Sequence, residues 1–64
     1  MSVPRIQELL KGEGYYEGDI TGMYDKKTAD AVTQFQRDNQ MDADGLVGLK
    51  TAAKLRELQQ RKQQ

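Results

Sequence analysis

Apolar residues recur at helical spacing near the start of the chain. Four of them fall on one face of a helix: Val3, Ile6, Leu9 and Leu10. Pro4 would lie in the first turn, where its missing N–H costs nothing, and the glycines that follow Lys11 are typical of a helix end. The pattern predicts a first helix over residues 3–11.

A second apolar stripe is the clearest in the sequence. Its positions follow the spacing i, i+3, i+4, i+7: Thr28, Ala31, Val32 and Phe35. Asp25 precedes the stripe as a good N-cap, because its carboxylate can accept the backbone N–H of Lys27 or Thr28. We expect the second helix to begin after Asp25 and to end near Asn39 or Gln40.

A third stripe, at Thr51, Leu55 and Leu58, predicts a helix from near Leu49 to about Gln60. The stretch "GEGYYEGDITGMYD" between the first two helices is rich in glycine and is predicted to be a structured loop. Together these elements predict an all-α fold, a compact three-helix bundle. One domain would span residues 1–60, followed by a polar tail at 61–64 that frays.

The sequence contains an internal repeat. Residues 22–32, "GMYDKKTADAV", match residues 45–55, "GLVGLKTAAKL", at an offset of 23 residues, so that each copy is a glycine-bearing turn followed by a helix. Neither copy is long enough to fold alone. We expect the two units to pack about a pseudo-two-fold axis around one shared core.

Composition excludes several classes of function. The 64 residues include no cysteine and no histidine, so the chain lacks a thiolate nucleophile, the usual general base and the usual zinc ligands. Ten basic residues balance ten acidic ones, which is not the charge of a nucleic-acid-binding protein. We expect no enzyme activity, no cofactor, no metal and no nucleic-acid partner.

No apolar run approaches the length of a membrane span, and no signal peptide is recognisable. A role outside the cytoplasm would then require a longer parent protein, another export route or release by cell lysis. We expect no membrane insertion and a monomeric chain.

Several polar and aromatic residues are candidates for a site, each with a structural alternative. "QMDADGLVGLKT" has the glycine of a calcium loop but lacks its first charged ligand and its final glutamate, so turn chemistry is the preferred interpretation. Tyr16 and Tyr24 could stack on sugars or could fill the core. Gln36, like Gln7, lies beside an apolar stripe; it either ties a loop to the bundle, the preferred interpretation, or binds a ligand.

The chain resembles the peptidoglycan-binding domain, a small three-helix module attached to bacterial and phage wall hydrolases, amidases and transpeptidases. The resemblance covers residues 3–58 and is most specific at "AVTQFQ", residues 31–36, and at "DGLVGLKT", residues 44–51. It implies a bundle of three helices that binds the cell wall without catalysis and holds a neighbouring enzyme at its substrate.

The chain departs from the family pattern at three places. Thr21-Gly22 and Tyr24-Asp25 stand where the family's first loop usually reads Asp-Gly followed by an aromatic residue and Gly. Leu49 stands where proline is common, and Gln40-Met41 replaces Gly-Leu. The change at position 21 removes an acidic group near the ligand face that the resemblance implies.

Two functions follow as hypotheses. The first is a wall-binding module of the cell envelope that recognises peptidoglycan or muropeptide fragments, fused to a catalytic domain or assembly, with five candidate ligand-binding residues: Tyr16, Tyr24, Asp25, Gln36 and Asp44. Asp25 and Asp44 are alternatively a helix cap and a turn residue. The second is a protein-interaction adaptor on the same scaffold, for which the basic, glutamine-rich end "KLRELQQRKQQ" could dock a partner.

Overall fold

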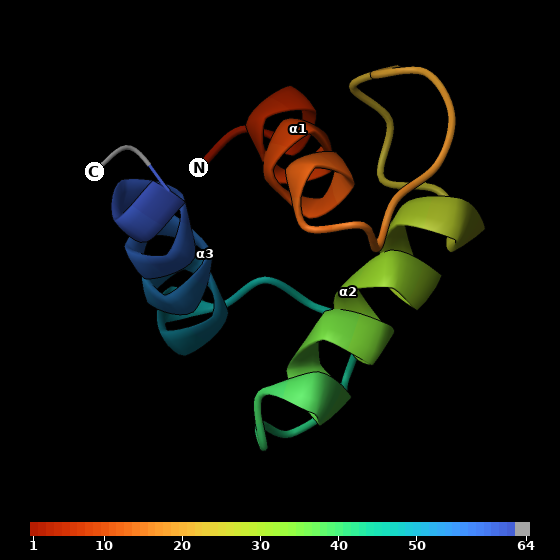
Figure 1. The fold of residues 1–64 in the computed structure, drawn as a ribbon. Helices are drawn as coiled ribbons and strands as arrows, with labels where there is room; N and C mark the ends of the chain where they lie inside the picture. Colours follow the sequence, from red (N-terminus) through yellow and green to blue (C-terminus); the bar gives the residue numbers. More distant parts are fainter. Residues whose placement is uncertain (63–64) are drawn as a thin grey trace.

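The computed structural model describes residues 1–62, and Figure 1 shows them folded into three helices. These are α1 (Val3–Gly12), α2 (Lys26–Asp38) and α3 (Leu49–Lys62). No strand occurs within the described residues. The predicted all-α three-helix fold is confirmed. Residues 61 and 62, expected in a frayed tail, belong to α3, and positions 63 and 64 of that tail lie outside the described residues.

Polar side chains fix where the first two helices begin. Asp25 caps α2 as predicted, because its Oδ1 accepts the backbone N–H of Thr28 at 3.0 Å and the Thr28 hydroxyl at 2.9 Å. In α1 the cap is Ser2, whose hydroxyl oxygen lies 3.4 Å from the backbone N of Arg5. Pro4 lies in the first turn of α1, where no N–H is needed.

The hydrophobic core lies around α1, which packs against both α2 and α3 (Figure 1). Its members are buried side chains from all three helices and one from the loop that follows α1: Ile6, Leu9, Leu10, Tyr16, Ala31, Val32, Phe35 and Leu55. The core is small, as expected of a chain this short, and burying each large apolar side chain contributes about 1.5–3 kcal/mol. Loss of a single core residue should therefore affect the whole bundle.

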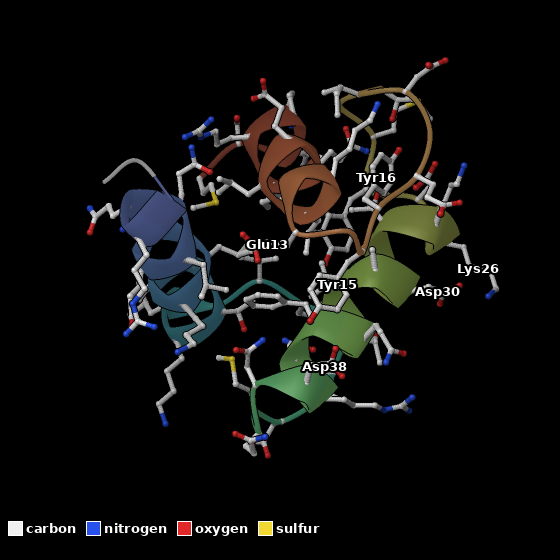
Figure 2. All side chains as sticks on the ribbon, viewed as in Figure 1. Glu13, Tyr15, Tyr16, Lys26, Asp30 and Asp38 are labelled. Carbon is white, nitrogen blue, oxygen red and sulfur yellow. The ribbon has the colours of Figure 1, made fainter. Side chains whose placement is uncertain are left out.

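The connection between α1 and α2, residues 13–25, contains no helix but is tied to its neighbours. The backbone N–H groups of Tyr15 and Tyr16 donate to the carbonyl of Leu10. The Tyr15 ring meets Phe35 edge to face at 5.6 Å, and its hydroxyl donates to Asp38 at 2.7 Å near the end of α2 (Figure 2). The start of this connection therefore packs against the C-terminal half of α2, and the chain then leads to the N-terminal end of the same helix.

Candidate functional site

Two buried glutamines each hold a turn against the bundle. Gln7, in α1, is fully buried, and its Oε1 accepts the backbone N–H of Gly22 at 2.9 Å. Its Nε2 donates to the carbonyl of Met23 at 3.0 Å and to the hydroxyls of Thr21 and Thr28 at 3.2 and 2.9 Å. One side chain therefore closes the turn before α2 and connects that turn to two helices.

Gln36, in α2, does the same for the turn before α3. Its Oε1 accepts the backbone N–H of Gly45 at 3.0 Å. Its Nε2 donates to Asp44 Oδ1, the carbonyl of Leu46 and the hydroxyl of Thr51, at 3.0, 2.9 and 3.1 Å. The preferred interpretation of these glutamines, that each ties a loop backbone to the bundle, is confirmed.

The partners of the two glutamines are related by the 23-residue offset of the sequence repeat. Every partner of Gln36 in the second turn corresponds to a partner of Gln7 in the first. Thr21 corresponds to Asp44: the Thr21 hydroxyl accepts the N–H of Met23 at 3.2 Å, and Asp44 Oδ1 accepts that of Leu46 at 2.9 Å. The two turns share one hydrogen-bond pattern, with a hydroxyl in the first and a carboxylate in the second. A pseudo-two-fold axis stays a prediction.

Tyr16 is part of the core. Its side chain is 3% exposed, and its hydroxyl donates to the carbonyl of Asp19 at 2.8 Å. Figure 2 shows it between α1 and the start of α2, and the ammonium of Lys27 lies 5.9 Å from the ring centroid. The ring is thus enclosed by the first loop and the two helices beside it, with little of its face open to a ligand.

Tyr24 links the two turns. It is partly exposed, and its hydroxyl donates to the carbonyl of Gly45. Burial, and secondarily the negative charge of Asp44, raise the pKa of Tyr24, so the hydroxyl stays protonated and keeps donating at neutral pH. The bond places Tyr24 beside the second turn, whereas Asp25, the next residue, serves as the α2 cap.

A groove of about 470 Å³ lies between the end of α2, the second turn and the start of α3. We call it the second-loop groove. It is lined by ten residues: Gln36, Gln40, Met41, Asp42, Asp44, Leu46, Gly48, Leu49, Lys50 and Thr51. It brings together two of the five predicted site residues, Gln36 and Asp44. Tyr24 reaches the same turn through Gly45, and Tyr16 and Asp25 do not line the groove.

Apolar residues make up a part of the groove that the sequence analysis missed. Leu46 and Leu49 are 65% and 92% exposed, and Met41 is half-buried against the core. A signal was present in the sequence, because Leu46 lies in a turn and Leu49 lies off the stripe formed by Thr51 and Leu55. Apolar side chains at such positions have no place in the core and remain available for contact with a ligand.

The polar side of the groove carries both signs of charge. Asp42 and Asp44 supply carboxylates, Lys50 an ammonium and Gln40 an amide. The N–H of Leu46, and then the Gln36 amide, hold the pKa of Asp44 below its usual range, so this carboxylate is ionised at neutral pH. Both bonds use Oδ1, and the Asp44 side chain is exposed, so that Oδ2 can meet a ligand.

Neither a metal centre nor a membrane span is apparent in the part of the chain that the structure describes. No three acidic side chains among residues 1–62 are grouped so that they could hold a metal ion. None of the three helices has the length and apolar content required to cross a bilayer.

A three-helix bundle with an open groove of mixed apolar and charged character has the form of a small ligand-binding module. The chain belongs to the peptidoglycan-binding domain family: the model of the family described as "Putative peptidoglycan binding domain" matches residues 2–55. The resemblance found in the sequence is therefore confirmed. No solved structure matches the chain significantly.

Proposed function

We propose that this chain binds peptidoglycan, without cleaving it, in the second-loop groove. The observation that carries the proposal is the family match over residues 2–55, a range that includes every residue lining the groove. The absence of cysteine and histidine from the sequence supports a noncatalytic role. No group in the groove resembles a nucleophile paired with a base.

The groove suits the chemistry of a muropeptide. Leu46 and Leu49 offer apolar surface to a sugar face or to an alanine side chain, and such contacts gain by removing that surface from water. The Oδ2 atom of Asp44 can accept a bond from an N-acetyl amide or from a diamino-acid ammonium. Lys50 carries the opposite charge, and its ammonium can pair with a stem-peptide carboxylate.

The five predicted site residues take different parts in this proposal. Asp44 contacts the ligand. Tyr24 and Gln36 fix the turn that carries Asp44, through their bonds to the carbonyl and the N–H of Gly45. Tyr16 and Asp25 act earlier in the chain, as a core residue and a helix cap.

A shallow, open groove on so small a module binds weakly, with a dissociation constant of about 10 µM to 1 mM. Weak binding suffices for a tether, because a polymeric wall presents many sites and an attached enzyme then works at a high effective concentration. We propose that the module acts in the cell envelope, as the binding part of a larger exported or phage protein.

Co-sedimentation with insoluble peptidoglycan sacculi tests the proposal. We expect saturable pelleting that soluble muropeptides compete away, and at least threefold weaker binding for Leu46→Ser. Met23→Ser is a matched control, because Met23 holds the corresponding position in the first turn, is also 65% exposed and lies outside the groove. Equal loss of binding in both variants would reject the groove as the site.

A protein-interaction adaptor is the second candidate function. The observation that favours it is the high exposure of Leu46 and Leu49, since protein interfaces also use exposed apolar side chains. If the folded domain pellets with sacculi of no stem-peptide type, peptidoglycan binding is rejected and the adaptor becomes the better hypothesis. Affinity capture by the wild type but not by Leu49→Ser would then identify the partner.

A further inference from the structure

A second cleft, of about 170 Å³, lies between α1 and α3 and shares no residue with the second-loop groove. It is lined by Arg5, Leu9, Arg56, Gln59 and Gln60. Figure 1 shows the N-terminal end of α1 beside the C-terminal end of α3, which brings these residues together from the two ends of the sequence. We call it the arginine cleft.

Helical spacing explains why these side chains meet. Arg5 and Leu9 are four residues apart on α1, so they lie one above the other on the same face. Arg56, Gln59 and Gln60 are related in the same way on α3. Leu9 is only 4% exposed and forms an apolar floor, above which two guanidinium groups and two amides supply hydrogen-bond donors.

The positive charge of the arginine cleft is poorly neutralised. Among residues 1–62, no carboxylate side chain lines it. Arg5 has one ion pair, to Glu8 at 4.0 Å, between side chains that are about half exposed, and such pairs contribute little. Within residues 1–62, Arg56 has no ion pair, and the carboxylate of the adjacent Glu57 pairs instead with Lys54 at 3.8 Å and with Arg61 at 2.8 Å.

The size and the donors of the cleft fit one small anionic group. Since a water molecule occupies about 30 Å³ in the liquid, the cleft of about 170 Å³ has the volume of roughly six waters, which is enough for one phosphate or carboxylate group. Guanidinium groups bind both oxyanions with paired N–H···O bonds. We propose that the arginine cleft is an oxyanion-binding site, for a phosphate or carboxylate group carried by the polymer that the domain contacts.

Nuclear magnetic resonance with inorganic phosphate as the probe tests this site directly. We titrate the full chain at constant ionic strength, with chloride as the balancing anion, and follow the Nε–H signals of the arginines. We expect saturable shifts for Arg5 and Arg56, with a dissociation constant in the millimolar range. A parallel titration with acetate distinguishes the sources: tighter phosphate binding indicates a phosphate-bearing polymer, and equal or tighter acetate binding indicates a carboxylate.

Three variants complete the test. Arg56→Gln and Arg5→Gln each remove one charge from the cleft and should weaken binding about threefold to tenfold. Arg37→Gln is the matched control, because Arg37 is exposed on α2 and lines neither cleft. Shifts that are absent, that stay linear, or that are equal at Arg37 would overturn the proposal. These measurements do not involve peptidoglycan, so their outcome is independent of the test of peptidoglycan binding described above.

Discussion

Gln36 uses both ends of its amide inside the fold, and only an amide can do so. The Oε1 atom accepts from Gly45, while the Nε2 atom faces Asp44 Oδ1 and the carbonyl of Leu46, both of which are acceptors. Gln36→Glu would present a buried carboxylate to these oxygens. We expect the variant to lower the free energy of unfolding by about 3 kcal/mol at neutral pH, measured by urea denaturation.

Gln34→Glu is the matched control for this substitution. Gln34 is exposed on the same helix, so its replacement should change the free energy of unfolding by less than about 0.5 kcal/mol. The defect of Gln36→Glu should also diminish in acid, where the carboxyl becomes protonated and again donates a hydrogen bond. A variant as stable as the wild type at neutral pH would contradict the role assigned to the Gln36 amide.

Residue types and spacing predicted single side-chain roles better than they predicted the site. The N-cap at Asp25 follows from local rules, because a cap and its partner Thr28 are close in sequence. The burial of Tyr16 depends on how the first loop closes over α1, and local patterns do not encode that closure. The structure brings together Gln36 and Asp44, two of the five candidate residues, through a hydrogen bond from the Gln36 amide to the Asp44 carboxylate, while their role in binding a ligand stays a prediction.

At the scale of elements, the second turn packs closely on α2 at position 45, where both the space and the backbone conformation favour glycine. Gly45 has φ +75°, and a Cβ there would lie 3.0 Å from the hydroxyl of Thr33 and 3.5 Å from the carbonyl of Ala29. Gly45→Ala therefore combines backbone strain with a close contact, and we expect a loss of about 1–2 kcal/mol. Thermal unfolding monitored by circular dichroism measures it.

Gly48→Ala provides the comparison within the same loop. A Cβ at Gly48 meets nothing within 4 Å, and its φ lies outside the left-handed region, so the expected change is within about 0.5 kcal/mol. Because the second turn forms one wall of the groove, Gly45→Ala should weaken binding to sacculi as well. Equal effects of the two alanines on stability would show that the turn is not constrained as described.

The three helices could be predicted from the sequence because each carries its own periodic stripe, which local spacing reveals. The groove could not, because it depends on the path of residues 39–48, where Gln40 adopts a left-handed conformation with φ 55° although it is not glycine. Helical periodicity also fails at the ends of helices: α3 continues to Lys62 through polar residues that no stripe marks. Loops and ends follow tertiary contacts, and a single sequence does not display those.

At the scale of the whole molecule, α1 is the element on which α2 and α3 both pack, so the bundle should unfold as one unit. Leu10 of α1 is fully buried, and Leu10→Ala should cost about 2–5 kcal/mol, much of the stability of a domain this small. We expect amide signals of all three helices to collapse together in nuclear magnetic resonance spectra. Leu49→Ala, at a 92% exposed position, is the control, and loss of α1 signals alone would contradict a single cooperative unit.

In acid, the molecule should lose stability through two carboxylates, that of the helix cap Asp25 and that of the turn residue Asp44. The N–H and then the hydroxyl of Thr28 lower the pKa of Asp25 below 3.8, and the N–H of Leu46 and then the amide of Gln36 do the same for Asp44. Their contribution is present above the unfolded-state pKa and is lost as pH falls through the lower folded-state pKa. Melting temperature should therefore fall below pH 3.8, and less steeply for Asp25→Asn. If the melting temperatures of the wild type and Asp25→Asn fall equally in acid, Asp25 is not a source of the loss.

At high pH, stability should fall as pH rises, because the group concerned is the phenol of Tyr15, whose neutral form is favoured in the folded state. The hydrogen bond to Asp38, then burial, then the charges of Asp38 and Glu13 raise the pKa of Tyr15 from 10.0 to about 12 (Figure 2). The folded state retains this proton longer than the unfolded state does. The stability that it contributes is present below pH 10 and is lost as pH rises to about 12.

Tyr15→Phe tests this alkaline limb. The variant loses one hydrogen bond, about 1 kcal/mol at neutral pH, but it carries no phenol to ionise at that position. Its stability should therefore decline less than that of the wild type between pH 10 and 12, the interval over which the Tyr15 contribution is lost. Tyr24→Phe is the companion variant, because the pKa of Tyr24 is also raised and its hydroxyl adds to the same loss of stability at high pH. Phenolate absorbance of the folded wild type, followed with pH, should show one tyrosine titrating near pH 12. If no tyrosine titrates above the usual range, the hydrogen bond between Tyr15 and Asp38 is not present in solution.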